Sequence, residues 1–313
     1  MSRDGKGAKL HIGTRGSPLA LAQTAAVCQA LARARGLTST GIEVRVIKTT
    51  GDQIQNRLLA DVGGKGLFTK EIEAALAAGE IDLAVHSAKD MPTALPDGLV
   101  ISAYLEREDV RDALVSRNAH SFADIPQGAS LGTASIRREA QAKRLRPDIQ
   151  IRPLRGNVHT RLRKVEDGEI DATILGMAGL KRLGLTAAIT QILPVEEFLP
   201  AVGQGAVAIE TRQDDGETRE LLAAINHAPT AAAVTMERAF LAVLDGSCRT
   251  PIAGHAVVSD NRIVFRGMIL QPLCGAVYET ERTGTIVDAS RLGADAGAEL
   301  KSRAGGDSMA QAV

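Results

Sequence analysis

The sequence predicts an α/β protein with two αβ series, followed by a smaller α+β unit. Strand and helix patterns alternate from residue 9 to residue 226, which is typical of mostly parallel sheets covered by helices. The chain after residue 226 instead indicates one helix, three strand-like runs and a final helix, as in an antiparallel sheet packed with helices. A length of 313 residues is enough for two or three domains with cores of their own.

The first series begins with a strand over residues 9–14 and a helix over 19–35. Ser17 is the expected N-cap of this helix, with Pro18 at its first position. A strand over 43–49, a helix over 67–78 and a buried strand over 81–86 complete the series. Residues 50–66 are polar and rich in glycine, so this long loop is either an active-site flap or a plain surface excursion.

The same hydrophobic periodicities predict the elements of the second series and of the C-terminal unit. Strands are predicted over 113–116, 129–133, 149–153, 172–175 and 204–210, and helices over 135–146, 158–167, 177–183 and 217–226. The C-terminal unit is predicted to contain helices over 231–244 and 289–303 and strands over 253–258, 262–270 and 276–283.

Composition narrows the classes of function. Basic and acidic residues number 37 each, which argues against a general polyanion binder, and aromatic residues are only 2%, which disfavours base-stacking nucleic-acid surfaces. Apolar runs stop short of the ~18 residues of a membrane helix, and the first residues show no export signal, so a cytoplasmic protein is expected. Three cysteines favour neither a disulfide framework nor a cysteine zinc site, and no metal is expected.

Positive charge gathers between residues 137 and 163, where eight arginines and one lysine accompany only two acidic residues. Many of these side chains can lie on solvated helix faces. Three strand-to-helix junctions differ, because hydroxyl and guanidinium groups there flank free backbone N–H groups and can bind anions. The junctions carry Arg15 and Ser17; Thr133, Ser135, Arg137 and Arg138; and Arg155, with Arg161 further along the next helix. Since no phosphate-loop sequence occurs there, carboxylates are favoured over phosphates as ligands.

A second polar cluster follows the buried strand at residues 81–86. Ser87, Lys89 and Asp90 come directly after this strand and before a proline, at the carboxyl edge of the predicted sheet. A single aspartate in such a place is commonly a helix cap or a turn residue. Its clustering with a lysine and a serine strengthens the case for a catalytic role and leaves both interpretations open. His86 is expected to be a partly buried histidine with its hydrogen bonds satisfied.

Of the three cysteines, Cys248 alone lies where a reactive thiol is expected. It belongs to a tight loop bounded by glycine and proline, and the adjacent Arg249 favours a lowered thiol pKa. From these residues alone, Cys248 is equally consistent with a reactive thiol and with a cysteine that has no role. Cys28 falls on an apolar helical stripe and is expected in the core, and nothing supports a role for Cys274.

Taken together, these motifs resemble the porphobilinogen deaminase family, also called hydroxymethylbilane synthases. Residues 237–254, ERAFLAVLDGSCRTPIAG, resemble the family's cofactor-attachment signature. Further matches, in the family's order, are RGSPLA at 15–20, GKGLF at 64–68, HSAKDMP at 86–92, GTASIRR at 132–138, RGNV at 155–158 and VGQGA at 202–206. The resemblance covers nearly the whole chain, and no motif residue departs from it.

The resemblance implies two related αβ lobes around a cleft, similar to type II periplasmic binding proteins, and a small α+β C-terminal domain. Lobe 1 would comprise residues 1–105 with 204–226 and would carry the catalytic aspartate and the flap. Lobe 2 would be the arginine-rich residues 106–203, and residues 227–313 would carry the cofactor cysteine. A monomer with neither a nucleic-acid nor a membrane partner is expected.

The resemblance also implies a chemistry. A dipyrromethane cofactor would be joined to Cys248 by a thioether, and four porphobilinogen molecules would be added to it head to tail, each losing ammonia. Hydrolysis would then release 1-hydroxymethylbilane for tetrapyrrole and haem biosynthesis, with Asp90 as the catalytic residue. The implied contacts to cofactor and substrate are Arg15, Ser17, Ser87, Lys89, Thr133, Ser135, Arg137, Arg138, Arg155, Arg161 and Arg182.

Lys65 and Phe68 are expected at the flap, where Phe68 either packs over the reacting pyrrole or belongs to the core at a helix start. Two other classes of protein are alternatives. A carboxylate-binding solute receptor would also use two lobes and an arginine-rich cleft, but the absence of an export signal and the additional cysteine-bearing domain argue against it. An RNA-binding protein is disfavoured by the neutral charge and the few aromatic residues.

Overall fold

The computed structural model describes residues 9–37, 39–53, 66–244, 251–271 and 276–305. The chain divides into two compact units. The first comprises Met1–Gln55, Gly64–Arg107 and Ala206–Ala231, and the second comprises Asn56–Gly63, Glu108–Gly205 and Ala232–Val313. Within the described residues, none of the helices has the length and apolar character that crossing a membrane requires.

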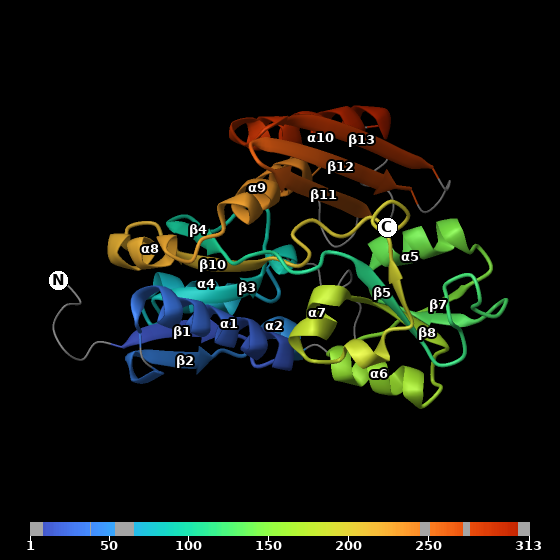
Figure 1. The fold of residues 1–313 in the computed structure, drawn as a ribbon, viewed down its shortest axis with the longest axis horizontal. Coiled ribbons are helices and arrows are strands. Elements are labelled where there is room, and N and C mark those ends of the chain that lie inside the picture. Colours follow the sequence, from blue (N-terminus) through green and yellow to red (C-terminus); the bar gives the residue numbers. More distant parts are fainter. Residues whose placement is uncertain (1–8, 38, 54–65, 245–250, 272–275, 306–313) are drawn as a thin grey trace. The chain divides into compact units, whose positions relative to one another are not determined.

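The first unit is built on one five-stranded sheet (Figure 1). Its elements are β1 (Leu10–Thr14), α1 (Pro18–Arg35), β2 (Ile42–Val46), α2 (Thr50–Gln53), α4 (Lys70–Ala77), β3 (Leu83–Ser87), β4 (Leu99–Tyr104), β10 (Val207–Arg212) and α8 (Gly216–Ala223). The strand order is β2-β1-β3-β10-β4. Strand β1 runs parallel to β2 and β3, whereas β10 runs antiparallel to β3 and β4.

Helix α1 begins and ends where the sequence predicts. The Ser17 hydroxyl accepts a hydrogen bond from the Ala20 N–H at 3.2 Å, and Pro18 occupies the first helical position. The helix ends at Gly36, whose φ of 66° is a left-handed conformation that glycine adopts without strain. Val27 and Leu31 bury its inner face against Ile12 and Leu83 of the sheet.

The second unit contains a five-stranded sheet of the same plan. Its elements are β5 (Asp112–Ser116), β6 (Ser130–Gly132), α5 (Ile136–Leu145), β7 (Gln150–Arg152), α6 (Val158–Glu166), β8 (Ala172–Gly176), α7 (Met177–Arg182) and β9 (Gln191–Leu193). The order is β7-β6-β8-β5-β9, in which β6 is parallel to β7 and β8 while β5 is antiparallel to β8 and β9.

The two sheets therefore confirm a pair of related αβ lobes, but the prediction of mostly parallel sheets is wrong. Half of the strand pairings in each sheet are antiparallel. The reason is an exchange of strands, because β10 follows the second lobe in the chain yet joins the first sheet. The sequence patterns indicate neither β4 nor β9, and the three residues of β9 are too few to show a pattern.

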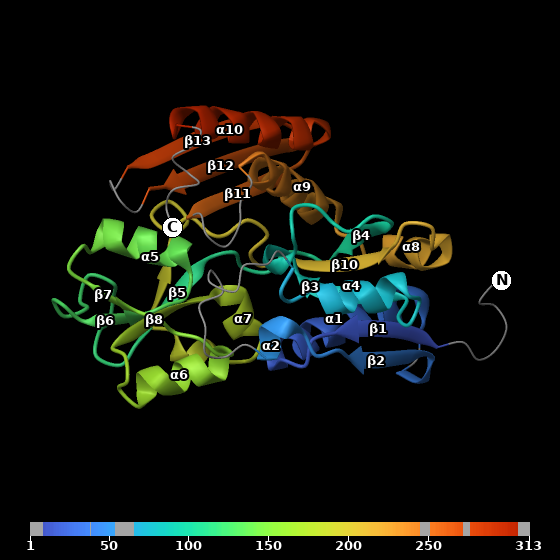
Figure 2. The same cartoon turned by 180° about the vertical axis from the view of Figure 1, so that it is seen from behind.

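The C-terminal part of the second unit is the predicted small α+β structure. It consists of α9 (Ala228–Val243), the antiparallel strands β11 (Ile252–Ser259), β12 (Arg262–Leu270) and β13 (Val277–Thr285), and α10 (Ala289–Arg303), which lies along β12 and β13 (Figures 1 and 2). Phe240 and Phe265 meet edge to face in its core, with ring centroids 4.9 Å apart. Gly293 is needed where α10 crosses α9, because a Cβ there would lie 2.1 Å from the Met236 carbonyl oxygen.

Candidate active site

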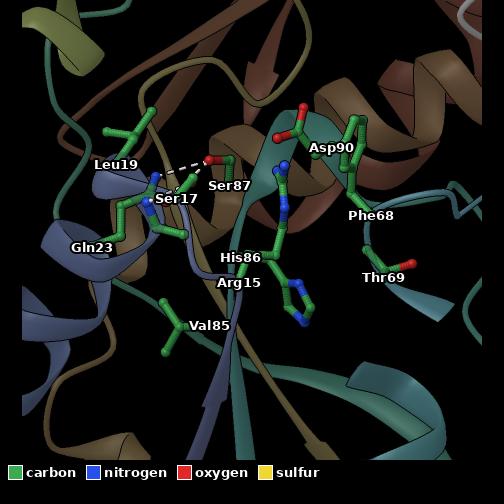
Figure 3. A pocket seen from close by; sticks show the side chains of 11 residues that line it. Arg15, Ser17, Leu19, Gln23, Phe68, Thr69, Val85, His86, Ser87 and Asp90 are labelled. Carbon is green, nitrogen blue, oxygen red and sulfur yellow. Dashed lines mark hydrogen bonds between the residues drawn. The ribbon is translucent and has the colours of Figure 1, made fainter. Parts of the chain in front are cut away.

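A pocket lies in the first unit at the carboxyl ends of the neighbouring parallel strands β1 and β3 (Figure 3). Its lining includes six residues that the sequence singles out: Arg15, Ser17, Phe68, His86, Ser87 and Asp90. They come from the β1–α1 junction, from the turn before α4 and from the end of β3. The topology thus brings together two of the predicted clusters, the first arginine junction and the polar residues after the buried strand.

Strand β3 carries Asp90 to the pocket. Its residues Leu83–Val85 are buried, and after Ser87 the chain turns through one turn of 3-10 helix, Ala88–Asp90. The Ala88 N–H donates to the Ala206 carbonyl of the neighbouring segment at 3.0 Å, which fixes the start of this turn. Asp90 is exposed and caps no helix, and its carboxylate has no hydrogen-bond or ion-pair partner among the residues that the structure describes.

Arg15 enters the pocket already held by two neighbours. Its Nη2 lies 2.5 Å from Asp52 Oδ1, and its guanidinium carbon lies 4.1 Å from the centre of the Phe68 ring. Burial alone would raise the pKa of Asp52, but hydrogen bonds from Arg15 and Thr49 outweigh it and lower that pKa. No motif or spacing singles out Asp52, because its carboxylate meets Arg15 only through the fold.

The two serines of the pocket already make hydrogen bonds. Ser17 caps α1, and the Ser87 hydroxyl accepts a hydrogen bond from Gln23 Nε2 at 2.9 Å (Figure 3). Gln23 is buried on α1 and was not predicted as a site residue, because a glutamine within a helix is ordinarily solvated. Lys89 is exposed beside Asp90 and is not among the residues that line this pocket.

A buried polar layer lies between the sheet and α4. His86 has a hydrogen-bond partner as predicted but is more deeply buried than the predicted partial burial, and its Nε2 lies 3.1 Å from Oε2 of the fully buried Glu210 on β10. Glu73 of α4 is 7% exposed, and its Oε1 has no hydrogen-bond partner within the described part of the chain. Burial raises the pKa of Glu73, and the negative charge of Glu210 raises it further.

This raised pKa predicts a pH-dependent effect of Glu73→Gln. The folded state binds a proton at Glu73 more tightly than the unfolded state, so the wild type loses stability as pH rises from the ordinary carboxyl range through the raised pKa. The glutamine variant lacks this titration. We expect its urea midpoint to exceed that of the wild type by more at pH 8 than at pH 4. A constant difference at both pH values, or the same gain in the exposed control Glu80→Gln, would contradict the assignment.

In the second unit, Arg137 and Arg138 converge on one buried carboxylate. The Nη2 atoms of both arginines lie 2.7 Å from Asp112, one on each carboxylate oxygen. Burial alone would raise the pKa of Asp112, but the two guanidiniums outweigh it and lower that pKa. Arg138 Nε is buried without a hydrogen-bond partner among the described residues.

Backbone and side-chain contacts fix this cluster from several sides. Gln204 Nε2 donates to Asp112 Oδ1 at 3.0 Å, and Arg137 Nη1 donates to the Leu199 carbonyl at 2.7 Å. Thr133 and Ser135 serve the start of α5, since the Thr133 hydroxyl accepts from the Ser135 N–H and the Ser135 hydroxyl accepts from the Arg138 N–H. The start of α5 after β6 is therefore fixed by several hydrogen bonds, which hold the guanidiniums of Arg137 and Arg138 in a buried position.

The remaining predicted arginines of this unit differ in their surroundings. Arg155 is half-buried, and among the described residues no hydrogen bond or ion pair holds its side chain. Arg161 Nε donates to the Gly156 carbonyl at 2.9 Å, and Arg182 Nη2 donates to the Gly205 carbonyl at 2.7 Å. Burial lowers the pKa of Arg182, and the charge of Glu108 opposes this shift only in part.

Some predictions lie outside the described residues. These are Cys248, Cys274, Lys65 and the part of the proposed flap over residues 54–65. Cys28, in contrast, packs half-buried against the core of the first unit as expected, and burial raises the pKa of its thiol.

Comparisons with known proteins match nearly the whole chain. Residues 10–220 match the family model "Porphobilinogen deaminase, dipyromethane cofactor binding domain", and residues 231–302 match "Porphobilinogen deaminase, C-terminal domain". The chain is 58% identical over 294 residues to a porphobilinogen deaminase of Nitrobacter winogradskyi and 57% identical to one of Nitrobacter hamburgensis; each alignment covers 94% of this chain and 93% of the relative.

Solved structures similar in fold include the VFT2 domain of Bordetella pertussis BvgS, in a double-mutant form (TM-score 0.41, 18% identity, 70% of this chain and 85% of that chain). They also include substrate-binding domain 2 of Lactococcus lactis GlnP (TM-score 0.41, 14% identity, 71% and 88%). At these identities the likeness concerns the fold alone.

Proposed function

Because the chain belongs to the porphobilinogen deaminase family, it polymerises porphobilinogen in tetrapyrrole biosynthesis, and we propose that Asp90 is the catalytic carboxylate of this reaction. One observation carries the proposal. Asp90 is an exposed carboxylate without a described partner, in a pocket that also contains the guanidinium of Arg15. A free anion and a cation in one small pocket suit a substrate that carries both an ammonium and carboxylates.

The chemistry needs an anion where positive charge develops. When the aminomethyl group of porphobilinogen loses ammonia, the substrate becomes a cationic azafulvenium. A carboxylate held against its pyrrole N–H groups stabilises that charge as it forms. The free α-carbon of a second pyrrole ring then attacks the methylene of the azafulvenium, a carbon–carbon bond forms, and the attacking carbon loses its proton. Asp90 accepts this proton and passes it to the departed ammonia, which leaves as ammonium. Each cycle thus consumes one porphobilinogen, releases one ammonium ion and restores the carboxylate.

Arg15 supplies the complementary charge. Each porphobilinogen carries an acetate and a propionate, and a planar guanidinium binds such carboxylates with two parallel hydrogen bonds. Phe68 lies against the face of Arg15, so the ring and the guanidinium form one wall of the pocket. Ser87 and Gln23 supply further hydrogen-bonding groups beside it.

The donor groups of the second unit fit a dipyrromethane cofactor, whose rings also carry carboxylates. Arg138 Nε is a buried donor without a described acceptor, and Arg137 lies beside it. We propose that these two arginines bind cofactor carboxylates, that Arg155 and Arg161 bind the growing chain, and that Cys248 holds the cofactor through a thioether. When bound, the cofactor supplies a tethered ring position for the first condensation, which keeps the product attached until four substrates have joined.

We propose that the enzyme is a hydroxymethylbilane synthase and that it acts as a cytoplasmic monomer. The purified protein incubated with porphobilinogen should release one ammonia per porphobilinogen consumed and one 1-hydroxymethylbilane per four. A protein that bound porphobilinogen without releasing ammonia would instead be a solute-binding protein. Ammonia release without the linear tetrapyrrole would contradict the proposed end product.

A further inference from the structure

Asp52 forms an ion pair with Arg15, and the proposed reaction assigns this pair no part. Arg15 Nη2 lies 2.5 Å from Asp52 Oδ1, and Arg15 Nε donates to the two carboxylate oxygens at 3.2 and 3.4 Å. This side-on pairing engages Nε and Nη2. A guanidinium has five N–H donors, so the edge that carries Nη1 stays available to a second carboxylate.

Asp52 is itself fixed by its surroundings. The Thr49 hydroxyl donates to Asp52 Oδ2 at 2.8 Å, and the Gly51 N–H donates to the Leu67 carbonyl at 2.8 Å. The second bond ties α2 to the turn that carries Phe68. A Cβ on Gly51 would lie 2.3 Å from the Phe68 ring, so only glycine allows this approach. These two segments, joined by this hydrogen bond, therefore fix Arg15 by its edge, through Asp52, and by its face, through Phe68.

The charges of the pocket show why such a restraint matters. Arg15 and Asp90 carry opposite charges and line the same pocket (Figure 3). Arg15 nevertheless pairs with Asp52, and Asp90 is unpaired among the described residues. Without Asp52, the attraction between opposite charges would draw Arg15 toward Asp90. Such a pair would occupy the guanidinium that binds substrate carboxylates and the carboxylate that stabilises the developing cation.

We propose that Asp52 is a positioning residue that holds Arg15 away from Asp90 and presents its free edge to a carboxylate of porphobilinogen. This proposal rests on the proposed function, because it assigns Asp52 a part in binding the substrate of that reaction. The side chain of Asp52 bonds to Arg15 and Thr49. It acts through Arg15, and proton transfer is assigned to Asp90 alone.

The test is the steady-state kinetics of Asp52→Asn with porphobilinogen. We expect KM to rise about tenfold while kcat changes less than about threefold, since a saturating substrate draws Arg15 back to its own carboxylate. Thr49→Val, which removes the hydroxyl that holds Asp52, should raise KM in the same direction by a smaller factor. The matched control is Glu43→Gln, which removes a carboxylate 2.9 Å from Arg45 on β2, outside the pocket, and should leave both constants unchanged.

A double-mutant cycle shows whether Asp52 acts through Arg15. In an Arg15→Lys background, which lacks the planar fork, Asp52→Asn should change KM less than about twofold. An unchanged or lowered KM in Asp52→Asn, or the same tenfold rise in the Arg15→Lys background, would overturn the positioning role. A wild-type protein that releases no ammonia would refute the proposed function itself, and the two failures are therefore distinguishable.

Discussion

Asp90→Asn should lower the turnover of porphobilinogen at least about 100-fold, the scale typical of removing one electrostatic stabiliser from an active site. The amide keeps the shape of the side chain but lacks the negative charge that opposes the azafulvenium cation, and it cannot accept the released proton. Because Asp90 is exposed and its carboxylate has no partner among the described residues, the substitution should leave the urea midpoint near that of the wild type.

The measurement is ammonia release per enzyme at saturating porphobilinogen, with Asp97→Asn as the control. Asp97 is an exposed aspartate that follows in the same connection and does not line the pocket. It should retain the wild-type rate. A near-normal kcat in Asp90→Asn would end the assignment of this residue as the catalytic carboxylate.

Asp112→Asn should be the most destabilising of the substitutions considered. The fully buried Asp112 carboxylate balances two buried guanidiniums, and removing one partner of a buried ionic cluster costs about 3–5 kcal/mol because the remaining charges lose their compensation. In the wild type, the contribution of ionised Asp112 to the free energy of unfolding should depend on pH. Since the folded-state pKa of Asp112 lies below its usual range, the stabilisation is present at neutral pH and is lost as pH falls below the ordinary carboxyl range.

Urea unfolding of Asp112→Asn, compared with Asp148→Asn, tests this account. Asp148 pairs with Arg146 at 2.8 Å but lies closer to solvent, so its replacement should shift the midpoint far less. Equal shifts in the two variants would show that burial does not set the strength of the Asp112 cluster. The Asp112 variant should also load less cofactor, because Arg137 and Arg138 would lose their fixed geometry.

Local features of the fold could be predicted from sequence because they depend on residues close together in the chain. The Ser17 cap, Pro18 and Gly36 define α1, and the polar residues after a buried strand place Asp90 at a sheet edge. Long-range pairings could not be predicted. Asp112 lies 25 residues from Arg137 and begins a strand, where an aspartate is ordinarily a turn residue.

Strand patterns also do not show how a strand pairs. The pattern of β10 does not indicate which sheet the strand joins, and its place in lobe 1 follows only from the family resemblance, which assigns residues 204–226 to that lobe. Asp52 lies in a glycine-rich stretch that is predicted to be a loop. Its proposed role depends on its contact with Arg15, which only the tertiary fold creates. Sequence patterns thus find the charged groups that a site requires, whereas the tertiary fold decides which of them are paired internally.

The intact mass of the purified protein is the most direct test of the account. It should exceed the mass of the sequence by one dipyrromethane, and the protein should give a colour with an acidic aldehyde reagent for pyrroles. Cys248→Ser should lose both signals together with activity, whereas Cys28→Ser, which changes a half-buried core thiol, should keep them. Wild-type protein that is fully active at the unmodified sequence mass, or an active Cys248→Ser variant, would contradict the tethered-primer mechanism.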